Sequence, residues 1–148
     1  MKLVRGSLLW TGKNNIPNKY TYLSEDIECQ VAIIGCGVTG AICGHYLTEA
    51  GINTIMVDKY LVGYGSTSGS TSILQYEIDY DLVQLEKMIG AEKALKSFQL
   101  CEKAVYDIEN IINSLDDKCG FQLRDSLYFS DKKSDSKSIR AEYYARKA

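Results

Sequence analysis

The sequence GCGVTG at residues 35–40 lies between a short apolar run and a helical pattern. The apolar run, Val31–Ile34, is typical of a strand buried on both faces in a parallel sheet. From Val38 to Ala50 apolar residues recur at helical intervals, and Gly51 follows where a glycine cap is expected. A second apolar run, Thr54–Val57, predicts another buried strand. This order predicts a βαβ unit whose two strands lie side by side in parallel.

The three glycines of residues 35–40 match the Gly-x-Gly-x-x-Gly fingerprint of dinucleotide-binding turns. Gly35 permits a tight turn, Gly37 lets the backbone approach a pyrophosphate, and Gly40 lets the helix pack closely on the strand. The helix N-terminus, at Val38 and Thr39, presents unpaired N–H groups and a partial positive charge to phosphates. The position of the turn between strand and helix therefore predicts a phosphate-binding site.

Asp58 follows the second predicted strand, about 20 residues after the fingerprint, where a carboxylate accepts hydrogen bonds from the ribose of a dinucleotide. Lys59 is a weak hint of the positive charge that an NADP site needs for its extra phosphate. Strand, turn, helix, second strand and acid together predict dinucleotide binding. The alternative is a glycine-rich turn that serves packing alone.

A loop rich in small hydroxyl residues, GYGSTSGSTS at residues 63–72, follows the second strand. Its backbone amides and hydroxyl groups are suited to contact the diphosphate and ribityl chain of an extended cofactor such as FAD. The alternative, a flexible linker, is disfavoured because apolar Ile73, Leu74 and Tyr76 follow at once. The loop has no Gly-Lys-Ser/Thr, so it is not a P-loop.

The segments on either side of this unit are less distinctive. Residues 1–28 read as an extended lead-in, which Trp10 and several tyrosines pin to a surface. Residues 29–80 form the expected FAD-binding βαβ unit and hydroxyl loop. Residues 81–148 are expected to hold a helical segment, a strand and the incomplete start of a following part.

Within residues 81–148, apolar residues spaced alternately four and three predict one helical seam. A long helix packed on its own protein is favoured over a coiled-coil dimer, because the seam is short and contains alanine and cysteine. Residues 121–130 read as a strand, residues 131–138 as a polar loop and residues 139–148 as the opening turns of another helix. The seam comprises Ala94, Phe98, Cys101, Val105, Ile108, Ile112 and Leu115.

Charge and cysteine usage exclude several classes of protein. Seventeen Lys and Arg against nineteen Asp and Glu give a net charge of −2, too little positive charge for sequence-independent nucleic-acid binding. Five cysteines without a Cys-x-x-Cys pair favour reduced thiols in the cytoplasm and no metal site. No apolar stretch is long enough for a signal peptide or a membrane span. His45, the one histidine, has no recognisable nucleophilic partner, so the catalytic residues are unknown.

The βαβ unit, Asp58-Lys59, the hydroxyl loop and the following Leu74-Gln75-Tyr76-Glu77 resemble the N-terminal part of FAD-dependent oxidoreductases of the D-amino-acid oxidase (DAO) type, particularly bacterial glycine and sarcosine oxidases. Asp58 departs from the glutamate more common in that family. The resemblance implies oxidation of a small amine or amino acid by hydride transfer to the flavin. The residues that it assigns to FAD are Gly35, Gly37, Gly40, Asp58, Lys59, Ser66, Thr67, Ser70 and Thr71.

The expected fold class is α/β: a Rossmann-like FAD/NAD(P)-binding βαβ domain, present as an N-terminal fragment with added helices. By the resemblance, later segments complete the sheet, cover the flavin and supply the substrate pocket. One alternative is a catalytically inert truncated fragment, or one part of a split enzyme that needs a complementing chain. Another is an NAD(P)-binding dehydrogenase domain, for which the hydroxyl loop would be incidental.

Overall fold

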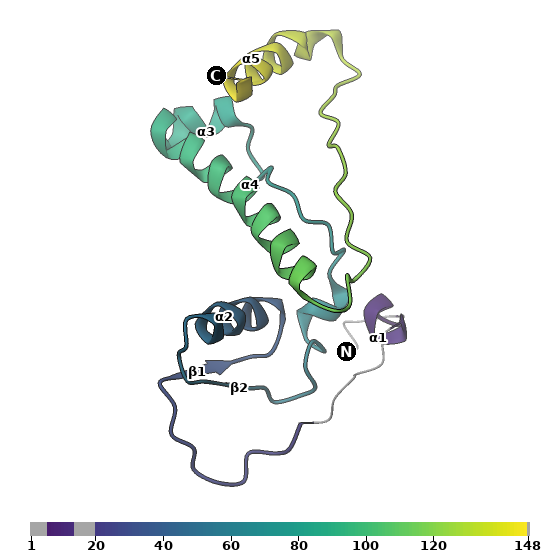
Figure 1. The fold of residues 1–148 in the computed structure, drawn as a ribbon. Helices are drawn as coiled ribbons and strands as arrows, with labels where there is room; N and C mark the ends of the chain where they lie inside the picture. The colour runs from purple at the N-terminus through teal and green to yellow at the C-terminus, as the bar shows by residue number, and fades with distance from the viewer. Residues whose placement is uncertain (1–5, 14–19, 148) are drawn as a thin grey trace, which may run out of the picture. The chain divides into compact units, whose positions relative to one another are not determined.

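The structure is a computed structural model that describes residues 6–13 and 20–147. The chain divides into two compact units, Met1–Ser72 and Ile73–Ala148, whose α-helices and strands are labelled in Figure 1. The first unit contains α1 (Leu9–Lys13), β1 (Val31–Ile34), α2 (Val38–Glu49), β2 (Thr54–Val57) and the 3-10 helix η1 (Ser66–Gly69). The second contains α3 (Leu82–Ile89), α4 (Ala91–Ser114), the 3-10 helix η2 (Lys133–Asp135) and α5 (Ser136–Lys147).

The predicted strands and the helix between them form as expected. β1 and β2 pair in parallel, with Val31 opposite Thr54 and Ile34 opposite Val57. α2 ends one residue earlier than predicted, and Gly51 follows it with a φ of +71°. The Gly51 amide donates to the Thr48 carbonyl at 2.9 Å, so the glycine cap closes the helix as predicted.

One face of this sheet is covered by α2 through two buried glycines, Gly40 and Gly44. A Cβ added to Gly44 would lie 2.8 Å from the Met56 sulfur, so the helix packs closely on the strands here. The prediction that both faces are buried is wrong for the described residues, because Ile34 is 90% exposed. Only α2 packs on these two strands among the described elements of the unit, and a single helix covers one face.

The lead-in is not extended throughout. Leu9–Lys13 forms the short helix α1, and its Trp10 indole N–H donates to the Ser70 carbonyl at 2.8 Å. Trp10 therefore pins the lead-in, as predicted, and the surface to which it binds is the hydroxyl loop. The prediction is wrong for the tyrosines, because Tyr20 and Tyr22 are 71% and 96% exposed. Residues 1–5 and 14–19 of the predicted lead-in lie outside the described residues.

The second unit is built around the beginning of the long helix α4. Gly90, at a φ of +89°, separates α3 from α4, so the predicted helical stretch is two helices. Of the predicted seam, Ala94 and Phe98 are buried and Leu115 is exposed, so the seam packs on its own chain mainly at its first turns. Tyr76 also packs in this unit, so the structural boundary falls before the one expected at residue 80. The buried cluster comprises Leu82, Leu85, Ala94 and Phe98.

The strand predicted at residues 121–130 does not form. In Figure 1 this segment is an irregular connection that leads from the end of α4 toward α5. Leu127 and Phe129 are 82% and 73% exposed. A strand requires hydrogen bonds to a neighbouring strand, and the described part of the second unit contains no strand. α5 begins at Ser136, within the predicted polar loop.

Candidate functional site

The fingerprint turn joins the end of β1 to the start of α2, and its geometry requires glycine at two positions. Gly35 has a φ of +108°, which side chains rarely allow, and its amide donates to the Val57 carbonyl at 2.8 Å. A Cβ added to Gly40 would lie 2.0 Å from the Gly35 carbonyl oxygen. No side chain fits in that space, so the turn and the first turn of the helix are in direct backbone contact.

The structure brings the hydroxyl loop to the fingerprint turn. The Val38 amide, at the N-terminus of α2, donates to the Thr67 hydroxyl oxygen at 2.9 Å. A Cβ added to Gly37 would lie 2.9 Å from the same oxygen. Thr39 belongs to the same exposed first turn of the helix. The predicted phosphate-binding turn and the predicted cofactor loop therefore meet at a single point.

Asp58 lies at the end of β2 with its carboxylate against the fingerprint turn. Its Oδ2 accepts a hydrogen bond from the Cys36 amide at 2.7 Å, and its Oδ1 accepts one from the Tyr60 amide at 2.9 Å. These amide contacts hold the pKa of Asp58 below its ordinary range, with a smaller contribution from the charge of Lys59. The carboxylate thus ties the turn to the end of β2, and each oxygen has a second lone pair that can accept a ribose hydroxyl.

The remaining predicted residues lie on exposed surface. Ser66 begins η1, Ser70 and Thr71 follow it, and all three are exposed. The Ser70 hydroxyl oxygen accepts from the Ser72 amide at 3.1 Å. The Lys59 ammonium lies 5.1 Å from the centre of the Tyr60 ring.

Ser68, which the sequence did not single out, is 3% exposed. Its hydroxyl donates to the Gly65 carbonyl at 2.8 Å. Within a run of serines and threonines, no sequence signal distinguishes the residue that holds the loop's own shape from its exposed neighbours.

Cys36, within the fingerprint, is 6% exposed. Burial and the nearby Asp58 charge raise the pKa of its thiol, so the sulfur stays protonated and is a poor nucleophile. Among residues 6–13 and 20–147, no three His, Cys, Asp or Glu side chains are grouped to hold a metal ion. In the same residues, no helix has the length and apolar character of a membrane crossing.

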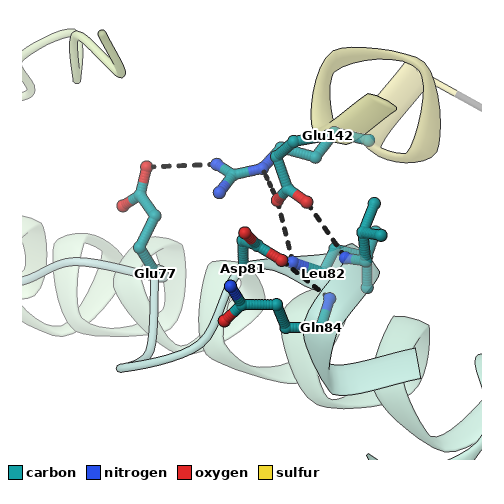
Figure 2. Close-up of polar contacts among 7 residues, drawn as sticks. Glu77, Asp81, Leu82, Gln84 and Glu142 are labelled. Carbon is teal, nitrogen blue, oxygen red and sulfur yellow. Dashed lines mark hydrogen bonds and ion pairs between the residues drawn. The ribbon is translucent and has the colours of Figure 1, made fainter. Parts of the chain in front are cut away.

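A buried ion pair in the second unit escaped the sequence analysis (Figure 2). Glu142 of α5 is 1% exposed, and its carboxylate accepts from the amides of Leu82 and Val83 at 2.8 and 3.0 Å. The Arg146 Nε donates to the same carboxylate at 2.6 Å, and Arg146 also pairs with Glu77 at 3.4 Å. The spacing of Glu142 and Arg146 suits a helical pair, but nothing in it indicates a contact with the distant start of α3.

Glu142 is kept ionised by these contacts. Burial alone would raise its pKa, but the Val83 and Leu82 amides and Arg146 outweigh that effect and lower it. The Arg146 guanidinium also lies 5.4 Å from the ring centres of both Phe98 and Tyr128. This arrangement joins α5 to the N-terminus of α3 and has a structural role.

A comparison with protein families identifies the chain. The family model described as DAO, FAD dependent oxidoreductase, matches residues 30–148. The chain belongs to this family. The family is FAD dependent, and the match covers both units, so the resemblance drawn from the fingerprint and the hydroxyl loop is confirmed.

Two curated proteins are similar to this chain. YhfW of Bacillus subtilis (strain 168), which is named as a Rieske 2Fe-2S iron-sulfur protein, is 25% identical over 138 residues, or 92% of this chain and 26% of its own length. Gamma-glutamylputrescine oxidoreductase of Escherichia coli (strain K12) is 32% identical over 82 residues, or 52% of this chain and 19% of its own length. The chain therefore spans about a quarter or less of these relatives. No solved structure matches it.

Asp58 is expected to make the free energy of unfolding of the first unit depend on pH in the acidic range. A carboxyl whose pKa is lowered by folding stabilises the fold above its unfolded pKa, and this contribution is lost as the pH falls through the lowered value. Denaturant titrations at a series of acidic pH values should show this loss in the unaltered chain. Asp58→Asn should reduce it, and an identical acid dependence in the two chains would contradict the assignment.

Proposed function

We propose that this chain supplies the FAD-binding part of a flavin-dependent oxidoreductase that oxidises an amine or amino acid. The observation that carries the proposal is the meeting of the fingerprint turn, the N-terminus of α2 and the Thr67 hydroxyl at one point. Family membership supports FAD as the cofactor. The amine class of substrate is supported by the resemblance to gamma-glutamylputrescine oxidoreductase, whose name gives such a substrate.

The residues at this point suit a dinucleotide. A side chain at Gly37 would fill the space next to the Thr67 oxygen, so its absence leaves the backbone approachable. The first turn of α2 presents amide donors and the positive end of a helix dipole, both favourable for a diphosphate. The ionised Asp58 carboxylate, at the end of β2, is suited to accept hydrogen bonds from a ribose.

The chain's own part in the reaction is to bind and orient the cofactor. A bound flavin would supply the acceptor for the hydride removed from the carbon beside the amine. The amides of the fingerprint turn hold the diphosphate, Asp58 holds the ribose and the hydroxyl loop contacts the rest of the cofactor. The proposed contacts are Gly35, Gly37, Val38, Thr39, Gly40, Asp58, Lys59, Ser66, Thr67, Ser70 and Thr71.

A second candidate is a chain that binds FAD but turns over substrate only with a complementing chain. By the family resemblance, the substrate pocket belongs to later segments, and the aligned residues amount to 26% and 19% of the two relatives. Oxidation of small amines and amino acids by the chain alone would exclude this candidate. If the chain binds FAD but oxidises none of these compounds, this second candidate is favoured over a chain that is active by itself.

An iron-sulfur function does not follow from the match to YhfW. A Rieske cluster is held by two cysteines and two histidines, and this chain contains one histidine. These 148 residues therefore lack the full ligand set, whatever the rest of YhfW binds. An NAD(P)-binding role is the remaining alternative for the fingerprint itself.

FAD titration of the 148-residue chain, with NADH in parallel, tests the proposal. We expect saturable FAD binding, seen as a change in flavin fluorescence, and weaker binding of NADH. Gly37→Ala should weaken FAD binding about tenfold or more, because its methyl group would meet Thr67 and narrow the approach of the diphosphate.

Gly65→Ala is the matched control, since a Cβ there meets nothing within 4 Å and its φ is −82°. Preferential binding of NADH, or equal FAD affinity for Gly37→Ala and the unaltered chain, would contradict the proposed site.

A further inference from the structure

The N-terminus of α2 already has an acceptor from its own chain. Val38 is the first residue of this helix of twelve residues, and its amide would otherwise lack an intrahelical partner. The Thr67 hydroxyl oxygen lies 2.9 Å from that amide nitrogen. The Thr67 oxygen therefore accepts the hydrogen bond that the Val38 amide would otherwise donate to a phosphate.

The hydroxyl loop, which carries Thr67, also contacts the lead-in. The Trp10 indole N–H donates to the Ser70 carbonyl at 2.8 Å, just after η1. A Cβ added to Gly69 would lie 3.6 Å from the Leu8 side chain, which is ordinary packing distance. α1 and η1 are in contact, so the 3-10 helix contacts both α1 and the start of α2.

We propose that α1, η1 and the start of α2 form a latch over the Val38 amide, with Trp10 as its positioning residue. The Thr67 hydroxyl and a phosphate of the dinucleotide compete for the Val38 amide, because one N–H makes one strong hydrogen bond. Trp10 restrains the loop in the position that favours Thr67. Cofactor entry therefore requires the hydroxyl loop to move away from Val38. The Trp10 hydrogen bond slows this movement. The latch rests on the proposed function, because its competitor is the proposed cofactor.

Trp10→Phe tests the latch, since phenylalanine keeps an aromatic ring and removes the N–H donor. Loss of one hydrogen bond corresponds to roughly a threefold to tenfold change in an equilibrium. We expect the rate constant for FAD association, measured by stopped-flow flavin fluorescence, to rise by about that factor. We also expect faster hydrogen exchange at the Val38 amide in the cofactor-free variant, a readout that needs no bound flavin.

Tyr22→Phe is the matched control, because Tyr22 belongs to the same lead-in and is 96% exposed. It should change neither readout. Thr67→Val removes the hydroxyl that accepts from the Val38 amide, so it should also speed hydrogen exchange at Val38. Thr67→Ser keeps the hydroxyl and should not. This pair tests the latch even if Trp10→Phe fails to fold.

The results separate the two proposals. FAD binding to the unaltered chain, with an equal or slower association rate in a folded Trp10→Phe, overturns the latch and leaves the proposed function intact. Unchanged exchange at Val38 in Thr67→Val also overturns the latch. Failure of the unaltered chain to bind FAD overturns the proposed function and the competition together.

Discussion

Gly40→Ala is expected to destabilise the first unit by about 3 kcal/mol or more and to abolish FAD binding. The added methyl carbon would lie 2.0 Å from the Gly35 carbonyl oxygen, a backbone atom that moves only if the fingerprint turn opens. Overpacking typically costs about 1–3 kcal/mol where side chains can adjust, and more where they cannot. Denaturant unfolding followed by the fluorescence of Trp10, the chain's one tryptophan, reports on this unit.

Gly12→Ala provides the control for this substitution. Its Cβ meets nothing within 4 Å, and the residue lies in α1 at an ordinary φ. Its stability should match that of the unaltered chain or rise slightly, because alanine is the better helix former. Equal stability of Gly40→Ala and Gly12→Ala would show that the close contact between Gly35 and Gly40 is not required.

Glu142→Gln is expected to destabilise the second unit by about 3–5 kcal/mol, the usual cost of removing one partner from a buried ion pair. The amide retains one oxygen for the α3 amides, but it removes the nearer carboxylate of the half-buried Arg146 and leaves the longer contact with Glu77, at 3.4 Å. Helical circular dichroism during denaturation reports on this unit, which contains most of the helical residues. Hydrogen exchange at Leu82 and Val83 should rise in the same variant.

The same carboxylate predicts an acid dependence. Because folding lowers the pKa of Glu142, its contribution should be complete above the unfolded pKa and lost as the pH falls through the lowered value. Glu102→Gln, on the exposed surface of α4, is the matched control and should cost little. Equal destabilisation by Glu142→Gln and Glu102→Gln would show that the buried pair of Glu142 and Arg146 does not stabilise the second unit.

The βαβ unit could be predicted almost residue by residue because its signals are local. A continuous apolar run, a glycine turn and a helical period each arise within a few residues, and the parallel pairing then follows from the right-handed crossover. The strand expected at residues 121–130 had an equally plausible local pattern. It does not form because strand formation depends on a neighbouring strand, which the pattern of one segment cannot reveal.

The candidate site could likewise be predicted where its signals are local, but not where distant residues meet. The three glycines, Asp58 and the hydroxyl loop were all singled out from their order in the sequence. The family comparison confirms the family, and the assignment of these residues to the cofactor stays a prediction. Which hydroxyl of the loop meets α2 was not predictable, because neighbouring serines and threonines look alike. The structure selects Thr67, places Ser68 inside the loop and attaches Trp10 to Ser70.

The amino-acid sequence by itself predicted the βαβ unit and a dinucleotide cofactor, and its resemblance to the DAO family indicated FAD. The physical reason is local: Gly35 has a φ that side chains rarely allow, and Gly40 lies too close to the Gly35 carbonyl for any side chain. The tertiary structure decided which distant groups pair: Asp58 with the Cys36 amide, Thr67 with the Val38 amide, and Glu142 with the start of α3. These contacts join residues more than twenty positions apart. Their partners are chosen by how the chain folds back on itself, so no local period in the sequence encodes them.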